Sequence, residues 1–248
     1  MTRKIEKTIE IDADAETVWR AIAEGEGLAR WFAPDARVTP GVGGGVWLSW
    51  GEGMEWESPI EVWEPNRHLR TADEMPTGKI AVDYYLETSG GKTVLRLVHS
   101  GFADDTWEGE LDALDAGWSS FFQNLKLYVE RHRGEPREMA WFRHEPLEIP
   151  IADAFRRTLE ALGLSPSVKV GDRYRTSNGL EGTVLVSAPP RGFSGTIANY
   201  DDGFLMVEVE GGKVRCRPAI WISLYGEQRK HAEEWRTKVR ELLTATFG

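Results

Sequence analysis

The sequence predicts an α+β protein in which a curved antiparallel sheet wraps around a long helix that follows it, and this arrangement occurs twice. Three observations predict this fold class. Between residues 46 and 99, short alternating segments are joined by turns rich in Gly, Pro and Asn, which is typical of an antiparallel meander. An apolar stripe with helical spacing follows them. A shorter version of the same order of segments recurs after residue 147.

The first half begins with a strand and two short helices. Alternating isoleucines predict a strand over residues 3–11. Asp12 or Asp14 can cap a helix that ends at Gly25, and GLARWF predicts a second short helix before a proline. The stretch PGVGGGV leads into a strand and lacks a Lys-Ser/Thr ending, so it is predicted to be a turn rather than a phosphate-binding loop. The strands of the meander are predicted at residues 46–50, 54–63, 67–73, 79–88 and 92–99.

The alternation within these strands assigns their side chains to two faces of the sheet. The inner face is predicted to carry Val46, Leu48, Trp50, Met54, Trp56, Ile60, Val62, Ile80, Val82, Tyr84, Leu86, Leu95, Leu97 and His99. The opposite face is predicted to be a solvated surface carrying Glu55, Glu57, Glu61, Asp83, Glu87 and Arg96.

The long helix that closes the first half has an apolar residue at every third or fourth position. We expect this stripe to lie across the concave face of the sheet. Gly117 interrupts it at a cost of about 1 kcal/mol relative to Ala, which indicates either a close approach to the sheet or a bend. The stripe consists of Trp107, Leu111, Leu114, Trp118, Phe121, Leu125 and Tyr128.

The second half repeats features of the first in the same order. Three pairs of segments match: LETSGGKT with VEVEGGKV, IEVWEPNRHL with VLVSAPPRGF, and LVHSGF with WISLYG. The last match makes Ser223 the counterpart of His99. Three matches at nearly constant spacing favour a tandem duplication over two unrelated domains with similar hairpins. We therefore predict a first domain of residues 1–134, a linker of residues 135–146 and a shortened second domain of residues 147–248.

The elements of the second half follow the same order. The stretch IADAFRRTLEALGL predicts a helix, strands are predicted at residues 172–176, 182–188, 193–199, 203–210 and 214–223, and the last helix has apolar positions at Ala232, Trp235, Val239 and Leu242.

Composition limits the classes of partner. The net charge is −11 for residues 1–136 and +1 for residues 137–248, so the first half is expected to repel the phosphate backbone of nucleic acid and not to bind it. No apolar run approaches the roughly 20 residues that span a bilayer. The single cysteine, Cys216, excludes an intramolecular disulfide and is predicted to be a buried strand residue; a cytoplasmic location is expected.

The first half resembles the START/Bet v1-like (SRPBCC) superfamily, whose helix-grip fold has this order of elements. It is most similar to the branch of the Aha1 C-terminal domain, the activator of Hsp90 ATPase. The resemblance covers residues 3–132 and is carried by IEIDADAETVWRAI, LARWFAP, LRLVHSGF and GWSSFFQNLKLYVE. It implies a cavity between sheet and helix that often binds an apolar or amphipathic molecule. It implies no single activity, because members include lipid carriers, cyclases and cochaperone-like proteins with roles in the stress response.

Few residues of this sequence point to catalysis. The five His residues show no metal-ligand spacing, no Gly-x-Ser-x-Gly elbow occurs, and neither a catalytic group, a metal nor a cofactor is predicted. His99 aims inward and is either a structural residue, a polar anchor for a ligand, or a general base. The predicted ligand-binding set is His99, Trp50, Trp56, Tyr84, Leu97, Trp118, Phe121, Phe122 and Leu125.

Three functions remain open at this stage. The leading hypothesis is non-enzymatic binding of a small hydrophobic or amphipathic ligand in the first domain. The second is a protein-interaction module that acts with a chaperone, and the third is a small cyclase or hydrolase that uses His99. The sequence does not specify the ligand or the oligomeric state.

Overall fold

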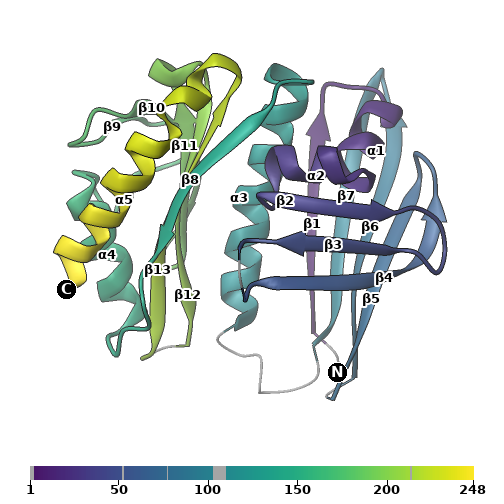
Figure 1. Cartoon of the computed structure of the whole chain (residues 1–248), viewed down its shortest axis with the longest axis horizontal. Helices are drawn as coiled ribbons and strands as arrows, with labels where there is room; N and C mark the ends of the chain where they lie inside the picture. The colour runs from purple at the N-terminus through teal and green to yellow at the C-terminus, as the bar shows by residue number, and fades with distance from the viewer. Residues whose placement is uncertain (1–2, 52, 77, 103–109, 213) are drawn as a thin grey trace. The chain divides into compact units, whose positions relative to one another are not determined.

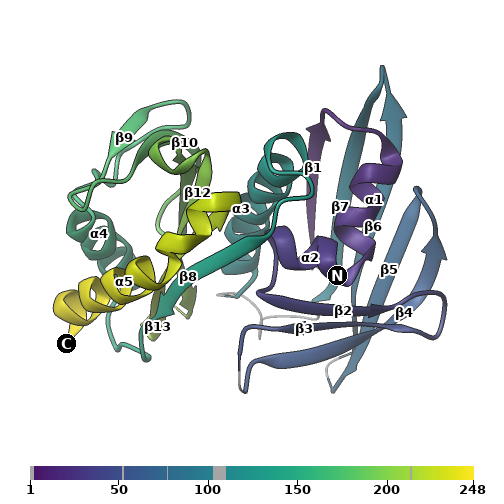
Figure 2. The same cartoon turned by 45° about the horizontal axis from the view of Figure 1, so that its top comes forward.

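The computed structural model describes residues 3–248 apart from residues 52, 77, 103–109 and 213. The chain forms two compact units, each built on one antiparallel sheet (Figures 1 and 2). The first unit comprises residues 1–108 and 124–134, and the second comprises residues 109–123 and 135–248. The division therefore passes through the long helix α3 (Glu110–Arg131).

The sheet of the first unit has the strand order β1-β7-β6-β5-β4-β3-β2. The strand that opens the chain pairs with the last strand of the meander, and α1 packs against β6 and β7. β2 is a strand that the sequence pattern did not predict. The elements are β1 Arg3–Ile11, α1 Ala15–Ala23, α2 Gly25–Trp31, β2 Asp35–Thr39, β3 Gly45–Ser49, β4 Glu55–Glu64, β5 His68–Met75, β6 Gly78–Ser89 and β7 Lys92–Phe102.

The capping residues of α1 show why the chain turns there. The Oδ1 atom of Asp14 accepts a hydrogen bond from the backbone N–H of Thr17 at 2.7 Å, so Asp14 is the cap. α1 ends at Ala23, and Gly25 begins α2 rather than ending α1. A Cβ atom at Gly25 would lie 2.6 Å from the carbonyl oxygen of Ala36, so only glycine allows α2 to start this close to β2.

A bulge in β4 changes which residues face inward. Ile60 and Val62 lie opposite consecutive residues of β5, so the register shifts at Glu61. Val62 therefore lies on the outer face, whereas Trp63 faces inward and packs edge-on against Trp19 of α1 at 5.1 Å. The prediction that Val62 faces inward is wrong, because strict alternation does not anticipate an extra residue.

The second unit has the same connectivity in a smaller sheet, with the strand order β8-β13-β12-β11-β10-β9. Its first strand again pairs with its last, and β8 lies within residues 135–146, where a linker was predicted. Two 3₁₀ turns, Ala198–Tyr200 and Gly226–His231, accompany the regular elements. These are β8 Arg137–Arg143, α4 Ile151–Ala161, β9 Arg173–Arg175, β10 Glu181–Ala188, β11 Gly192–Ile197, β12 Gly203–Gly211, β13 Cys216–Tyr225 and α5 Ala232–Phe247.

Both sheets carry a bulge at the same place. The shift between Ile60 and Val62 in β4 is matched by one between Val184 and Val186 in β10, and all four residues keep the spacing of the sequence repeat. Two helix-grip copies in tandem account for this correspondence. The second copy has one helix, α4, where the first has α1 and α2, and its described residues include no strand in the place of β2.

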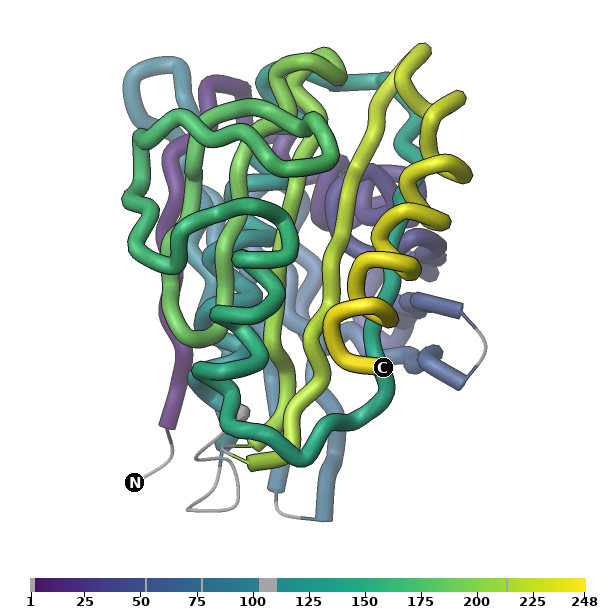
Figure 3. Tube along the Cα trace, turned by 90° about the vertical axis from the view of Figure 1, so that its left-hand side faces the viewer, coloured from purple at the N-terminus to yellow at the C-terminus, as the bar shows by residue number. Residues whose placement is uncertain are grey.

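One face of the second sheet is closed by helices. α4 and α5 contact β12, β13 and β8 and each other, and Figure 3 shows both helices in front of the strands. Phe155 of α4 and Trp235 of α5 are buried in the resulting core, which also contains Cys216 of β13, as predicted. In the described part of the chain, no helix is both long and apolar enough to cross a membrane.

Candidate functional site

The inner face of the first sheet brings together three of the predicted site residues. On β6 and β7, Tyr84 lies directly opposite Leu97, and His99 follows on the same face. Leu125, in the part of α3 that belongs to the first unit, is fully buried like Leu97. Tyr84 is 6% exposed. Tyr84 and the half-buried His99 are thus polar side chains of this face beside the fully buried Leu97.

A bulge at the end of β7 explains the sequence His-Ser-Gly-Phe. Ser100 and Phe102 lie opposite consecutive residues of β1, so Gly101 is the extra residue. Gly101 has φ +99°, and a Cβ atom there would lie 2.0 Å from the carbonyl oxygen of Lys79. The bulge brings the fully buried ring of Phe102 to 4.7 Å from the imidazole of His99.

Burial keeps both polar groups of this face uncharged. Loss of hydration lowers the pKa of His99 to about 4 and raises the pKa of the Tyr84 hydroxyl above its ordinary value. At neutral pH the face therefore presents a neutral imidazole and a neutral phenol. Groups of this kind exchange hydrogen bonds with a ligand without requiring a charge on it.

The part of α3 that belongs to the first unit is held there by polar side chains that sequence reasoning missed. The buried Nδ2 of Asn124 donates to the carbonyl oxygen of Trp31 at 2.7 Å, and Lys126 donates to the carbonyl oxygen of Glu10 at 2.5 Å. The signal for Asn124 was an amide in the apolar run FFQNL, where an unpaired polar group would be costly.

Trp50 and Trp56 form an aromatic cluster where β3 ends and β4 begins. Their rings stack at 4.8 Å, and Phe32, which follows α2, packs edge-on against Trp50 at 5.3 Å. Trp56 is 48% exposed and Trp50 is half-buried. Among the described residues, neither ring is in ring contact with His99.

The remaining predicted residues lie in the part of α3 that belongs to the second unit. Trp118 contacts Phe121 and Phe122, with ring centroids 6.4 and 6.2 Å away. Gly117 allows a close approach there, because a Cβ atom would lie 3.1 Å from Oε1 of Glu208 on β12. Trp107, the first residue of the predicted stripe, lies outside the described residues.

The outer face of the first sheet holds a buried carboxylate rather than a fully solvated surface. Asp83 is 3% exposed and accepts hydrogen bonds from Nε2 of His68 and Nη1 of Arg70, both at 2.7 Å. The His68 ring stacks on Tyr85 at 4.2 Å. Asp83 does face outward as predicted, but the side chains of its neighbours cover it. Within the described residues, no group of three His, Cys, Asp or Glu side chains is arranged to hold a metal ion.

The second copy replaces the polar pair of the inner face with apolar residues. Thr71 of β5, Val82 of β6 and His99 of β7 lie opposite one another and form one row across three strands of the first sheet. The corresponding row across β11, β12 and β13 of the second sheet ends at Ile222. His99 therefore corresponds to Ile222, not to Ser223 as the sequence alignment predicted. In the same way Tyr84 corresponds to Val207, which lies opposite Ile220. Val207, Ile220 and Ile222 are fully buried in the core.

The comparisons with known proteins assign a family match to the first half. Residues 12–130 match the family model described as Activator of Hsp90 ATPase homolog 1-like protein. The predicted resemblance to this branch of the START/Bet v1-like superfamily is thereby confirmed for that part of the chain. No curated protein matches the chain.

Solved structures resemble the chain over one copy or over both. The Aha1 dimer from Colwellia psychrerythraea is similar at 24% identity over 53% of this chain and 99% of that chain, with a TM-score of 0.48. DynU16, from the dynemicin biosynthetic locus, is similar at 18% identity over 98% of this chain and 95% of that chain, with a TM-score of 0.45.

Proposed function

We propose that the first unit binds a small, uncharged amphipathic molecule on the inner face of its sheet, without catalysing a reaction. The observation that carries this proposal is the pair of neutral polar groups, the buried Tyr84 and the half-buried His99, beside the fully buried Leu97 on one face of the sheet. The apolar part of the ligand would contact Leu97 and Leu125, and the polar end would exchange hydrogen bonds with the pair.

The positions of the two polar groups favour a single ligand. Leu97 lies opposite Tyr84, and His99 is two residues further along β7, so Tyr84 and His99 are diagonal neighbours in an antiparallel pair. Such neighbours are separated by about 7–8 Å, a distance that one small molecule spans. A charged ligand would lose its hydration in this apolar environment without an opposite charge from either group, so a neutral one is favoured.

Native mass spectrometry of the full chain tests the proposal. We expect an added mass that disappears on denaturation, or uptake of a neutral amphipathic compound from a mixed lipid and metabolite pool. His99→Phe and Tyr84→Phe should reduce this uptake, because each removes one polar anchor while keeping an apolar ring. The matched control is Tyr85→Phe, which changes the adjacent residue on the opposite face. A mass that never differs from that of the bare chain would contradict the proposal.

The family match favours a second candidate, a protein-interaction module that acts with a chaperone. Under this function a surface of the first unit, with its excess of negative charge, contacts a basic patch on the chaperone. Stimulation of the ATPase of a purified Hsp90 by the full chain would support it. Stimulation that survives His99→Phe, combined with no ligand uptake, would replace the binding proposal.

The third possibility, a small cyclase or hydrolase with His99 as general base, is the least favoured. A general base works best when its pKa lies near the operating pH, whereas burial lowers that of His99 to about 4. Turnover of a candidate substrate that is abolished by His99→Phe would reinstate it.

A further inference from the structure

The inner face of the first sheet carries a carboxylate that the sequence pattern did not assign to it. Asp73 of β5 lies opposite Ile80 of β6, and Leu69 of the same strand lies opposite Tyr84, so regular alternation places Asp73 on the face of Tyr84. Asp73 is half-buried. Its Oδ2 accepts a hydrogen bond from the hydroxyl group of Ser58 at 2.7 Å. The inner face therefore includes an acidic group.

The second oxygen of this carboxylate is not engaged by the protein. Among the described residues, Oδ1 of Asp73 accepts no hydrogen bond and the side chain makes no ion pair. Lys79 of the neighbouring strand forms ion pairs with Glu61 and Glu74 instead. An ionised carboxylate only accepts hydrogen bonds, so Asp73 is available to a donor that comes from outside the chain.

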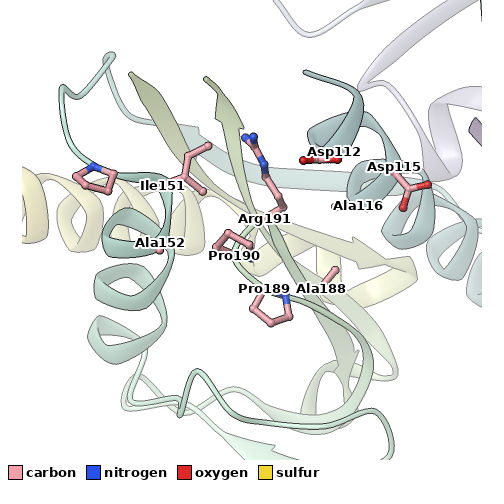
Figure 4. Close-up of a pocket in the computed structure, with 10 residues that line it drawn as sticks. Asp112, Asp115, Ala116, Ile151, Ala152, Ala188, Pro189, Pro190 and Arg191 are labelled. Atoms are coloured by element: carbon pink, nitrogen blue, oxygen red, sulfur yellow. The ribbon is translucent and has the colours of Figure 1, made fainter. Parts of the chain in front are cut away.

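The basic group of a pocket in the second unit, by contrast, has partners within the chain. This pocket has a volume of about 530 Å³ and lies between the first turns of α3, the start of α4 and the turn that joins β10 to β11 (Figure 4). Its buried Arg191 donates from Nη1 to the carbonyl oxygens of Val209 at 3.3 Å and Gly211 at 2.6 Å. Burial lowers the pKa of the guanidinium group, and the negative charge of Asp112 counteracts this effect. Arg191 is therefore engaged inside the chain, whereas Asp73 keeps an acceptor for a ligand.

An accessible strip of the inner face joins Asp73 to His99. It consists of half-buried residues from three neighbouring strands: Thr71 and Asp73 of β5, Ile80 and Val82 of β6, and His99 of β7. The two apolar side chains occupy its middle, because β6 lies between β5 and β7. The strip therefore presents an apolar centre with a hydrogen-bonding side chain at each end.

The spacing of this strip sets the size of a ligand that uses both ends. Thr71 and His99 belong to one row across the three strands, and Asp73 is two residues further along β5. With about 4.8 Å between strands and about 3.4 Å per residue, the Cα atoms of Asp73 and His99 lie about 12 Å apart. Both side chains rise from the same face, so a rigid body of two aromatic rings can reach both.

We propose that the ligand of the first unit carries a hydroxyl group that donates a hydrogen bond to Oδ1 of Asp73. This inference rests on the proposed function and adds the chemistry of the ligand's second end. The apolar body extends over Val82 and Ile80, and the other polar group meets His99. A hydroxyl group that donates to a carboxylate forms a charge-assisted hydrogen bond, which is stronger than a neutral one. Ser58 holds the carboxylate by its other oxygen.

A ligand that lacks this donor should bind more weakly. An ether oxygen in the same place would remove water from Asp73 without replacing its hydrogen bond, and leaving a charged acceptor unpaired costs binding free energy. Tyr84 and the neutral His99 each have a donor, so they tolerate either a hydroxyl group or an ether oxygen. Asp73 is therefore the residue of this face that selects a donor.

Two symmetric compounds that differ only in their donors test the proposal. The diol is 4,4′-dihydroxybiphenyl and the diether is 4,4′-dimethoxybiphenyl, and equilibrium dialysis against the full chain measures the affinity of each. We expect the diol to bind at least about tenfold more tightly than the diether.

Variants then assign this preference to one residue. Asp73→Asn should reduce the ratio of the two affinities to about twofold or less, because a carboxamide donates to an ether oxygen and still accepts from Ser58. The matched control is Glu74→Gln, which changes the adjacent carboxylate on the opposite face of β5 and should leave the ratio unchanged. His99→Phe should weaken the binding of both compounds and keep the ratio between them.

The outcomes separate this inference from the function on which it rests. Equal affinity for the two compounds, with weaker binding of both by His99→Phe, would overturn the role of Asp73 and leave the proposed function standing. A preference for the diol that persists in Asp73→Asn would do the same. Binding of neither compound would overturn the inference alone if native mass spectrometry shows uptake of another molecule, and both proposals if it shows none.

Discussion

Replacing His99 by Gln should remove a specific part of the dependence of stability on pH. Burial lowers the pKa of His99 in the folded chain to about 4, against 6.5 for the unhindered side chain. Above pH 6.5 the imidazole is neutral in both states and its titration costs nothing. As the pH falls from 6.5 toward 4, the unfolded chain takes up a proton that the folded chain does not, so the folded state loses stability across this interval.

The size of this loss follows from the two pKa values. Proton linkage gives about 2 kcal/mol less stability at pH 5 than at pH 7.5, and about 3 kcal/mol once the pH lies below 4. His99→Gln lacks this loss, so the difference in unfolding free energy between the variant and the parent chain should shift by about 2 kcal/mol between these two pH values.

Urea unfolding followed by tryptophan fluorescence measures this difference. Most tryptophans lie in the first unit, so the signal reports mainly on the unit that contains His99. NMR titration of the imidazole protons, assigned by their absence in His99→Gln, gives the pKa directly. An imidazole that titrates near 6.5, or parallel pH profiles of the two chains, would show that His99 is hydrated rather than enclosed by the inner face.

Further substitutions probe the other features of the two sheets. Asp83→Asn should lower the unfolding free energy by roughly 2–4 kcal/mol, because it removes the buried carboxylate that His68 and Arg70 contact. Urea unfolding measures this loss, and a change below about 0.5 kcal/mol would mean that the cluster is solvated. Gly101→Ala should cost at least about 2 kcal/mol, since it combines φ +99° with a backbone clash; an unchanged thermal midpoint would contradict this bulge. Burial, together with the negative charge of Glu210, raises the pKa of Glu208 above its ordinary value of 4.5. The parent chain should therefore lose stability as the pH rises above 4.5, whereas Glu208→Gln should lose less, and parallel profiles would refute this.

The order of elements and the inner position of His99 were predictable because both depend on local periodicity. Alternation within a strand assigns faces without any knowledge of the partner strand, and this suffices for Tyr84, Leu97 and His99. The same reasoning fails for Val62, where a bulge adds one residue to β4. Alternation also fails to predict β8, because its apolar stretch is short. The strand becomes recognisable through its pairing with β13, which lies far along the chain.

The parts of the site that depend on several strands were not predictable. Asp83 on β6 is covered by His68 and Arg70, which lie on the neighbouring strand β5 of the same hairpin. The pocket at Arg191 combines two helices and a turn, and no single stretch of sequence carries its signature. Composition and alternation describe one element at a time, whereas these features arise from side chains of different elements meeting.

The inner faces of the two copies differ in the side chains that they carry. Strand pairing, rather than the alignment of motifs, shows that Ile222 and Val207 occupy the places of His99 and Tyr84. An isoleucine and a valine in a core already filled by α4 and α5 offer no hydrogen bond and no charge, so the inner face of the second copy stabilises its own fold. Under the proposed function, a ligand that needs a polar anchor would therefore discriminate between the copies by these two side chains.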